Sequence, residues 1–172
     1  VADPPTSSIV VFDVPRRKIF RMGVREPNQL GKPVSLAIDA KDLDNRSGHL
    51  SALSGDTLID IGTATFNNQG GGLYAHQLLK VIAGDFNNQG VSSGQGGKVA
   101  AGRIDFGLSG VLNNSYGILE SASTLNLTAT SLDNRHGRLR ALGTSGDTRI
   151  NAVSLDNRSG LIETANTNFK MS

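Results

Sequence analysis

A short motif with an invariant asparagine recurs six times and constrains the fold more than any other feature of the sequence. The motif begins with Leu or Phe, continues with Asp or Asn, and ends on the invariant Asn. The copies are Leu43-Asp44-Asn45, Phe66-Asn67-Asn68, Phe86-Asn87-Asn88, Leu112-Asn113-Asn114, Leu132-Asp133-Asn134 and Leu155-Asp156-Asn157. Their asparagines are 23, 20, 26, 20 and 23 residues apart. A repeat of this length is typical of a solenoid, in which each copy forms one coil.

Apolar and polar residues alternate before each motif, which predicts a strand with one buried face. With the asparagines aligned, three buried columns contain Leu36, Ile59, Leu79, Leu125 and Thr148, then Ile38, Ile61, Val81, Leu127 and Ile150, then Ala40, Thr63, Ala83, Ala129 and Ala152. A second, shorter strand follows the motif, with a buried column of Leu50, Leu73, Val99, Leu119, Leu139 and Ile162. We therefore predict an all-β parallel β-helix, or solenoid, of about six coils, each with two strands and two turns.

Three irregularities account for the unequal spacing of the motifs. Residues 91–96 are an insertion beside the Asn turn, and three extra residues lie near residues 54–56 and again near residues 145–147. In the fourth copy, Ile104, Phe106 and Leu108 are apolar one position early, which predicts a one-residue bulge before Leu112. A solenoid tolerates insertions of this kind at its turns.

The prolines divide the chain into two parts. All five lie within residues 1–33, and the remaining residues, 34–172, have none. Because proline cannot donate a hydrogen bond to a sheet, its absence fits continuous stacked strands. We predict an irregular, basic, proline-containing head or cap at residues 1–33 and β-helix repeats at residues 34–172. Within the head, residues 9–14 are predicted to form a strand.

Composition narrows the classes of protein to which the chain can belong. Aromatic residues make up 5% of the chain and cysteine is absent, which favours small, evenly sized layers over a bulky core and excludes a disulfide framework. A net charge of +2 is too small to indicate a nucleic-acid partner. The sequence contains no apolar run long enough for a membrane span and no signal-peptide region at its start, so we expect a mature chain or an excised fragment.

The invariant asparagines are interpreted as a structural turn ladder. Asparagine tolerates left-handed backbone angles, and its amide can bond the turn backbone or the asparagine one coil away. The ladder would contain Asn45, Asn68, Asn88, Asn114, Asn134 and Asn157. Glycine follows three residues later in five copies, and we expect it to need positive φ. These glycines are Gly48, Gly71, Gly117, Gly137 and Gly160.

The charged residues do not form a recognisable catalytic or metal site. Asp precedes the invariant Asn where Arg follows it, so the pairs Asp44 and Arg46, Asp133 and Arg135, and Asp156 and Arg158 balance charge within a coil. Outside that column, Asp105, Glu120 and Glu163 have no partner signature for acid and base catalysis. The three histidines lack metal-ligand spacing. We predict no catalytic residues, no metal and no cofactor, and expect that the protein is not an enzyme.

One dense basic run is a candidate binding site for a glycan or another anion. It contains Arg16, Arg17, Lys18 and Arg21. A solvated charged face is the competing interpretation of the same residues.

The repeats resemble those of filamentous haemagglutinin. The resemblance rests on Leu-Asp-Asn-Arg-Ser-Gly-His-Leu-Ser-Ala at residues 43–52, Leu-Asp-Asn-Arg-His-Gly-Arg-Leu-Arg-Ala at residues 132–141 and the two copies of Phe-Asn-Asn-Gln. It covers about residues 34–170. That family includes large exoproteins of two-partner secretion and the sticks of contact-dependent growth inhibition. The resemblance implies a right-handed β-helix, export through an outer-membrane transporter, and a location at the surface of a Gram-negative bacterium or in its medium.

Three functions compete at this stage. The first is a structural and adhesive rod segment that contacts a receptor or glycan on a host or neighbouring cell. The second is a receptor- or glycan-binding module that uses the basic head and residues 91–96. The third, a polysaccharide-cleaving enzyme, rests on fold analogy alone.

Overall fold

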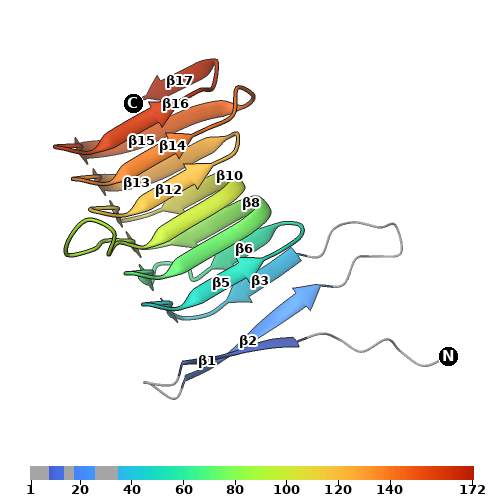
Figure 1. The fold of residues 1–172 in the computed structure, drawn as a ribbon. Helices are drawn as coiled ribbons and strands as arrows, with labels where there is room; N and C mark the ends of the chain where they lie inside the picture. The colour runs from blue at the N-terminus through green and yellow to red at the C-terminus, as the bar shows by residue number, and fades with distance from the viewer. Residues whose placement is uncertain (1–7, 14–17, 26–34) are drawn as a thin grey trace.

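The structure, a computed structural model, describes residues 8–13, 18–25 and 35–172, and this part of the chain is all-β (Figure 1). Its strands are β1 (Ser8–Asp13), β2 (Lys18–Arg25), β3 (Ser35–Asp39), β4 (Leu43–Asp44), β5 (His49–Ala52), β6 (Thr57–Asp60), β7 (Phe66–Asn67), β8 (Gly72–Ala83), β9 (Phe86–Asn87), β10 (Lys98–Leu108), β11 (Val111–Asn113), β12 (Ile118–Ser121), β13 (Leu125–Asp133), β14 (Arg138–Ala141), β15 (Asp147–Asp156), β16 (Leu161–Thr164) and β17 (Asn168–Met171). Among these residues no helix is long and apolar enough to cross a membrane.

The strands from β3 onward stack in parallel register as coils, which confirms the predicted β-helix (Figure 1). Each coil has three sides rather than the two expected. Face 1 contains β5, the first parts of β8 and β10, then β12, β14 and β16. Face 2 contains β3, β6, the second parts of β8 and β10, the beginnings of β13 and β15, and β17. Face 3 contains the short strands β4, β7, β9 and β11 and the ends of β13 and β15.

The expected register is wrong in the second coil. Thr57, not Ile59, pairs with Leu79, and Ile59 pairs with Val81. The three extra residues are split between the two sides of β6: one precedes Thr57, and two lie before β7, where Gly62 has a φ of 61°. The hydrophobic alternation of this coil fits either register, because a shift of two residues keeps the same side chains inside.

The other irregularities lie where the sequence predicts them. Thr148 pairs with Leu125, so residues 142–147 take up all three extra residues of that coil. The register resumes after residues 91–96, where Lys98 pairs with Gly72. A register shift between Ala101 and Arg103 brings Ile104 opposite Leu79 one position early. The alignment is restored at Leu112, after Val111, whose N–H donates to the Asp85 carboxylate at 2.7 Å.

The core is a set of stacked apolar columns inside the three faces. The largest fully buried side chains include Phe66, Phe86 and Phe106. The rings of Phe66 and Phe86 lie with centroids 4.9 Å apart at an interplanar angle of 85°, and Phe86 and Phe106 are also 4.9 Å apart. Burying each large apolar side chain contributes about 1.5–3 kcal/mol. The buried columns end at Ile150, and the last coil exposes apolar side chains such as Phe169.

The described part of the head is a hairpin, so the head is not irregular throughout. β1 contains residues 8–13, which agrees with the predicted strand. β1 pairs antiparallel with β2, and β2 pairs antiparallel with β3 over Arg25–Ser35 to Gly23–Ala37. The hairpin therefore occupies the N-terminal edge of face 2, an edge that would otherwise present unpaired backbone groups.

Candidate functional site

The six asparagines of the motif form a continuous internal ladder at the turn between face 3 and face 1, which we call the Asn turn. Each side-chain Nδ2 donates to the Oδ1 of the next asparagine at 2.7 or 2.8 Å, from Asn45 through to Asn157. The first five asparagines are at most 6% exposed. Each of these five also donates from its backbone N–H, at 2.7 Å, to the carbonyl before the next asparagine. A buried amide ladder of this kind fixes the register of neighbouring coils.

The glycine three residues after each asparagine has a different role from the one expected. The positive φ lies one residue earlier, at Ser47, Gly70, Tyr116, His136 and Ser159. The glycine itself is required because there is no room for a side chain. A Cβ on Gly137 would meet the backbone oxygen of Asn114 and lie 2.6 Å from Oδ1 of Asn134. Gly97 takes this position after the insertion, with Asn68 and Asn88 as its neighbours. The ladder and the glycine column are thus one packing unit.

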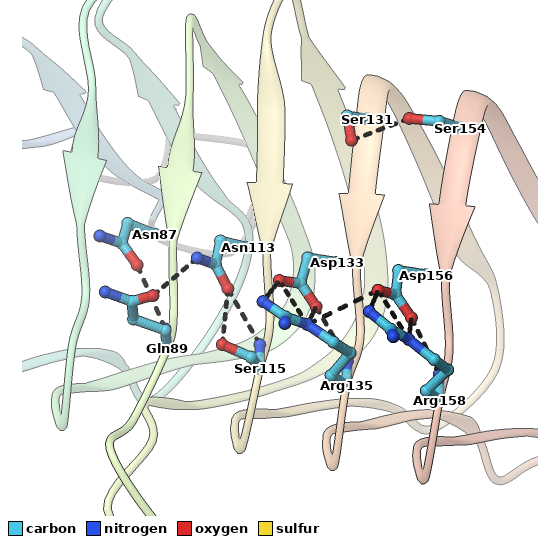
Figure 2. A network of polar contacts seen from close by, with 10 residues as sticks. All are labelled: Asn87, Gln89, Asn113, Ser115, Ser131, Asp133, Arg135, Ser154, Asp156 and Arg158. Carbon is cyan, nitrogen blue, oxygen red and sulfur yellow. Dashed lines mark hydrogen bonds and ion pairs between the residues drawn. The ribbon is translucent and has the colours of Figure 1, made fainter.

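A polar strip runs along the outside of the Asn turn (Figure 2). In three coils the arginine after the asparagine holds the aspartate before it, as in Arg158, whose Nη2 lies 2.6 Å from Oδ2 of Asp156. Arg135 also reaches Asp156 of the next coil at 3.7 Å. In the middle of the strip, where charge is absent, the Asn113 amide donates to Gln89 Oε1 at 2.7 Å.

These arginines change the acidity of the aspartates in the strip. The side-chain hydrogen bond from Arg158 is the main cause that lowers the pKa of Asp156 to about 2. The hydrogen bond from Arg135 likewise lowers the pKa of Asp133, although burial and the neighbouring Asp156 act in the opposite direction. Asp133 and Asp156 pair directly across coils, so the arginines offset a repulsion that stacking creates.

The insertion at residues 91–96 forms one wall of a groove on the outer side of the first coils. In Figure 1 its loop projects from the stack at the Asn-turn edge. The groove has a volume of about 840 Å³. Its lining includes His49 and Tyr74 on face 1, Lys98 and Gln95 near the loop, and the backbone of residues 70–72. A smaller hollow of about 350 Å³, lined in part by Tyr116, His136 and Arg138, includes Ser93 of the same loop.

Neither hollow has a carboxylate in its lining. Arg46, which also lines the groove, is held by Asp44 through three hydrogen bonds. Lys98, in contrast, has no ion pair among the described residues and is exposed. The groove therefore combines one unpaired cation with an exposed tyrosine and several amide side chains.

The remaining candidate residues fall into separate places. Arg16 and Arg17 lie outside the described residues, and Lys18 and Arg21 lie on β2, where only the backbone is described. Glu120 and Glu163 both contact Arg140, at 2.6 and 3.2 Å. Asp105 accepts a hydrogen bond from the Asn126 amide at 2.8 Å. No group of three His, Asp or Glu side chains in the described part could hold a metal ion.

The loop of the groove is predictable from the sequence as an insertion, but its opposite wall is not. Tyr74 pairs with Ser51 and Ala100, so it lies in an outward-facing column of otherwise small side chains at this end. An aromatic residue at an outward position of a repeat could have indicated the groove, because every other coil has a polar or small residue there.

Comparisons with known proteins do not identify a family. Searches of protein-family models, of curated proteins and of solved structures found no match for this chain.

Proposed function

We propose that this chain is a structural and adhesive rod segment of a large secreted bacterial exoprotein of the filamentous haemagglutinin kind. One observation carries the proposal: the asparagine ladder runs through all six motifs without a break. A stack held by the same buried bonds in each coil keeps its shape at any length, which is the requirement of a surface rod.

Catalysis is not part of this proposal. Glu120 and Glu163 share Arg140 as an ion-pair partner, and the aspartates beside the motif are held by arginines of their own coils. A low pKa, such as that of Asp156, keeps a carboxyl group ionised and unsuitable as a general acid at neutral pH. Incubation with acidic and neutral polysaccharides should release no new reducing or unsaturated ends.

The exported location is tested with antibodies against the chain on intact cells of the source bacterium. We expect labelling of the surface or recovery of the protein from the medium, and loss of both when the gene of the outer-membrane transporter partner is deleted. Labelling that appears only after the cells are permeabilised would contradict the proposal. A cytoplasmic marker protein, stained in the same cells, controls for breakage.

A further inference from the structure

The groove beside residues 91–96 has a fixed wall. Gly90 donates its N–H to the Ser115 carbonyl at 2.9 Å, and Gly97 donates to the Asn88 carbonyl at 2.9 Å, so both ends of the loop are bonded into the stack. Glycines allow the close approach: a Cβ on Gly96 would meet the backbone of Tyr116, and one on Gly90 would meet the backbone of Gly96. Such a wall can hold ligand-binding groups in place before binding.

The lining of the groove includes residues with little or no side chain. Gly72 and Ala100 line it, and the imidazole of His49 lies against Gly72, where a Cβ would meet its ring. Tyr74 and Lys98 stand on neighbouring strands, two residues and one coil apart. Their Cα atoms are thus separated by about 8 Å, from a rise of about 3.3 Å per residue and a strand spacing of about 4.8 Å.

The groups that line the groove suit a sugar with an acidic substituent. Tyr74 is 37% exposed and offers a ring face with a hydroxyl at its end. Gln69 and Gln95 supply amide side chains, which both donate and accept hydrogen bonds. Gln89 adds its amide NH2, because its oxygen already accepts from Asn113. Lys98 supplies a positive charge that no described carboxylate neutralises, whereas Arg46 is already bound to Asp44. The volume lies within the range of about 300–1,000 Å³ that is usual for ligand sites.

We propose that this groove binds an acidic oligosaccharide, with a sugar ring on Tyr74, its carboxylate or sulfate at Lys98 and its hydroxyls on the glutamine amides. Tyr74 and Lys98 occupy outward positions of neighbouring strands, so one ligand can contact both side chains. An acidic peptide is the competing occupant, but its extended backbone has no use for a ring platform flanked by three amides. The site does not depend on whether the chain is part of a rod.

Binding is measured by calorimetry on the whole chain, with oligogalacturonate, a heparin fragment and sialyllactose as acidic probes. Lactose and neutral dextran fragments serve as uncharged counterparts. We expect binding to at least one acidic probe, no measurable binding to the neutral sugars, and weaker binding at higher salt because the Lys98 contact is screened. Failure of all acidic probes, or equal binding of neutral ones, would overturn the proposal.

Four variants locate the site. Tyr74→Ala and Lys98→Gln should each raise the Kd at least tenfold, while Tyr74→Phe should keep most of the affinity because it keeps the ring. Arg103→Gln is the matched control, since Arg103 is exposed but lies outside the groove lining.

Thermal unfolding of each variant checks that the coils are intact. Unchanged binding in Tyr74→Ala, or an acidic peptide that binds more tightly than the sugars and is lost with Tyr74, would contradict the assignment. Surface labelling of cells, which tests the rod, is unaffected by either result.

Discussion

The two corners at the ends of face 1 both connect stacked strands, but one keeps a constant length along the stack and the other does not. At the Asn turn four residues connect face 3 to face 1 in every coil except the one with the insertion at residues 91–96. At the opposite corner, the number of residues between the last buried column of face 1 and the first buried column of face 2 varies from two (102–103) to six (142–147). We call this second corner the variable corner.

The difference follows from what each corner buries. The Asn turn buries a chain of amides, whose donors and acceptors must all line up with those of the neighbouring coils. The variable corner has no such chain, and where it is longest a single asparagine of the next coil braces it. Asn166 donates to the carbonyls of Gly143 and Ser145 at 2.7 and 3.1 Å and accepts from Thr148 at 2.6 Å. Both corners bury polar groups, but only the Asn turn has a chain of amides that continues from coil to coil, and this corner keeps a constant length.

The largest expected effect comes from cutting the ladder in its middle. Asn114→Ala removes the bonds to Asn88 and Asn134 and leaves both amides with unmet donors or acceptors in a buried turn. We expect a loss of about 3–5 kcal/mol in the free energy of unfolding, measured with urea. Asn157→Ala, at the partly buried end of the ladder, removes one ladder bond and a longer bond to the Gly160 carbonyl, and should lose about 1 kcal/mol. Equal losses in the two variants would mean that the ladder does not set the stability of the Asn turn.

A smaller loss is expected when the space beside the ladder is filled. In Gly137→Ala the new Cβ would press on the Asn114 carbonyl and the Asn134 amide, which are parts of the ladder and cannot move freely. We expect a loss of about 2–3 kcal/mol, typical of overpacking. Gly107→Ala is the control, because Gly107 is exposed on face 2 and a Cβ there meets nothing within 4 Å. A loss of the same size at Gly107 would show that the effect is not steric.

The Asn turn was the more predictable of the two corners. The invariant asparagine and the placement of residues 91–96 follow from the repeat itself, since constant spacing is visible in a sequence. The sequence predicts the positive φ one residue too late, because Tyr116 and His136 adopt the left-handed conformation without being glycine. At the variable corner the repeat predicts the extra residues near 145–147 correctly. For the coil of Ile59 it predicts a strand register that is wrong by two residues. A shift of two keeps the alternation of buried side chains, so only the strand pairing could resolve it.

Two threonines in one core column give a test at the variable corner itself. Thr57 Oγ1 is buried without a hydrogen-bond partner, whereas Thr148 Oγ1 bonds Asn166 and Thr164. Replacing Thr57 by valine removes an unmet polar atom and should raise the free energy of unfolding by about 1 kcal/mol. Thr148→Val removes the donor to Oδ1 of Asn166 and should lower the free energy of unfolding by about 1–2 kcal/mol. Changes of the same sign in both variants would rule out Asn166 as the brace of the long corner.

The smallest effect is expected outside the Asn turn, where Arg158 holds Asp156. The pKa of Asp156 is about 2 in the folded chain, below the usual 3.8, so folding favours the ionised form. This stabilisation is complete above about pH 4 and is lost as the pH falls toward about 2.

Carbon NMR of the carboxyl groups should give Asp156 a midpoint near pH 2, which Arg158→Gln should raise toward the usual value. Asp133, whose first partner is Arg135, should keep its lowered pKa in the same variant. A midpoint of Asp156 that does not move would show that the arginine side chain does not lower this pKa, and would leave the backbone N–H of residue 158, which also bonds the carboxylate, as the cause.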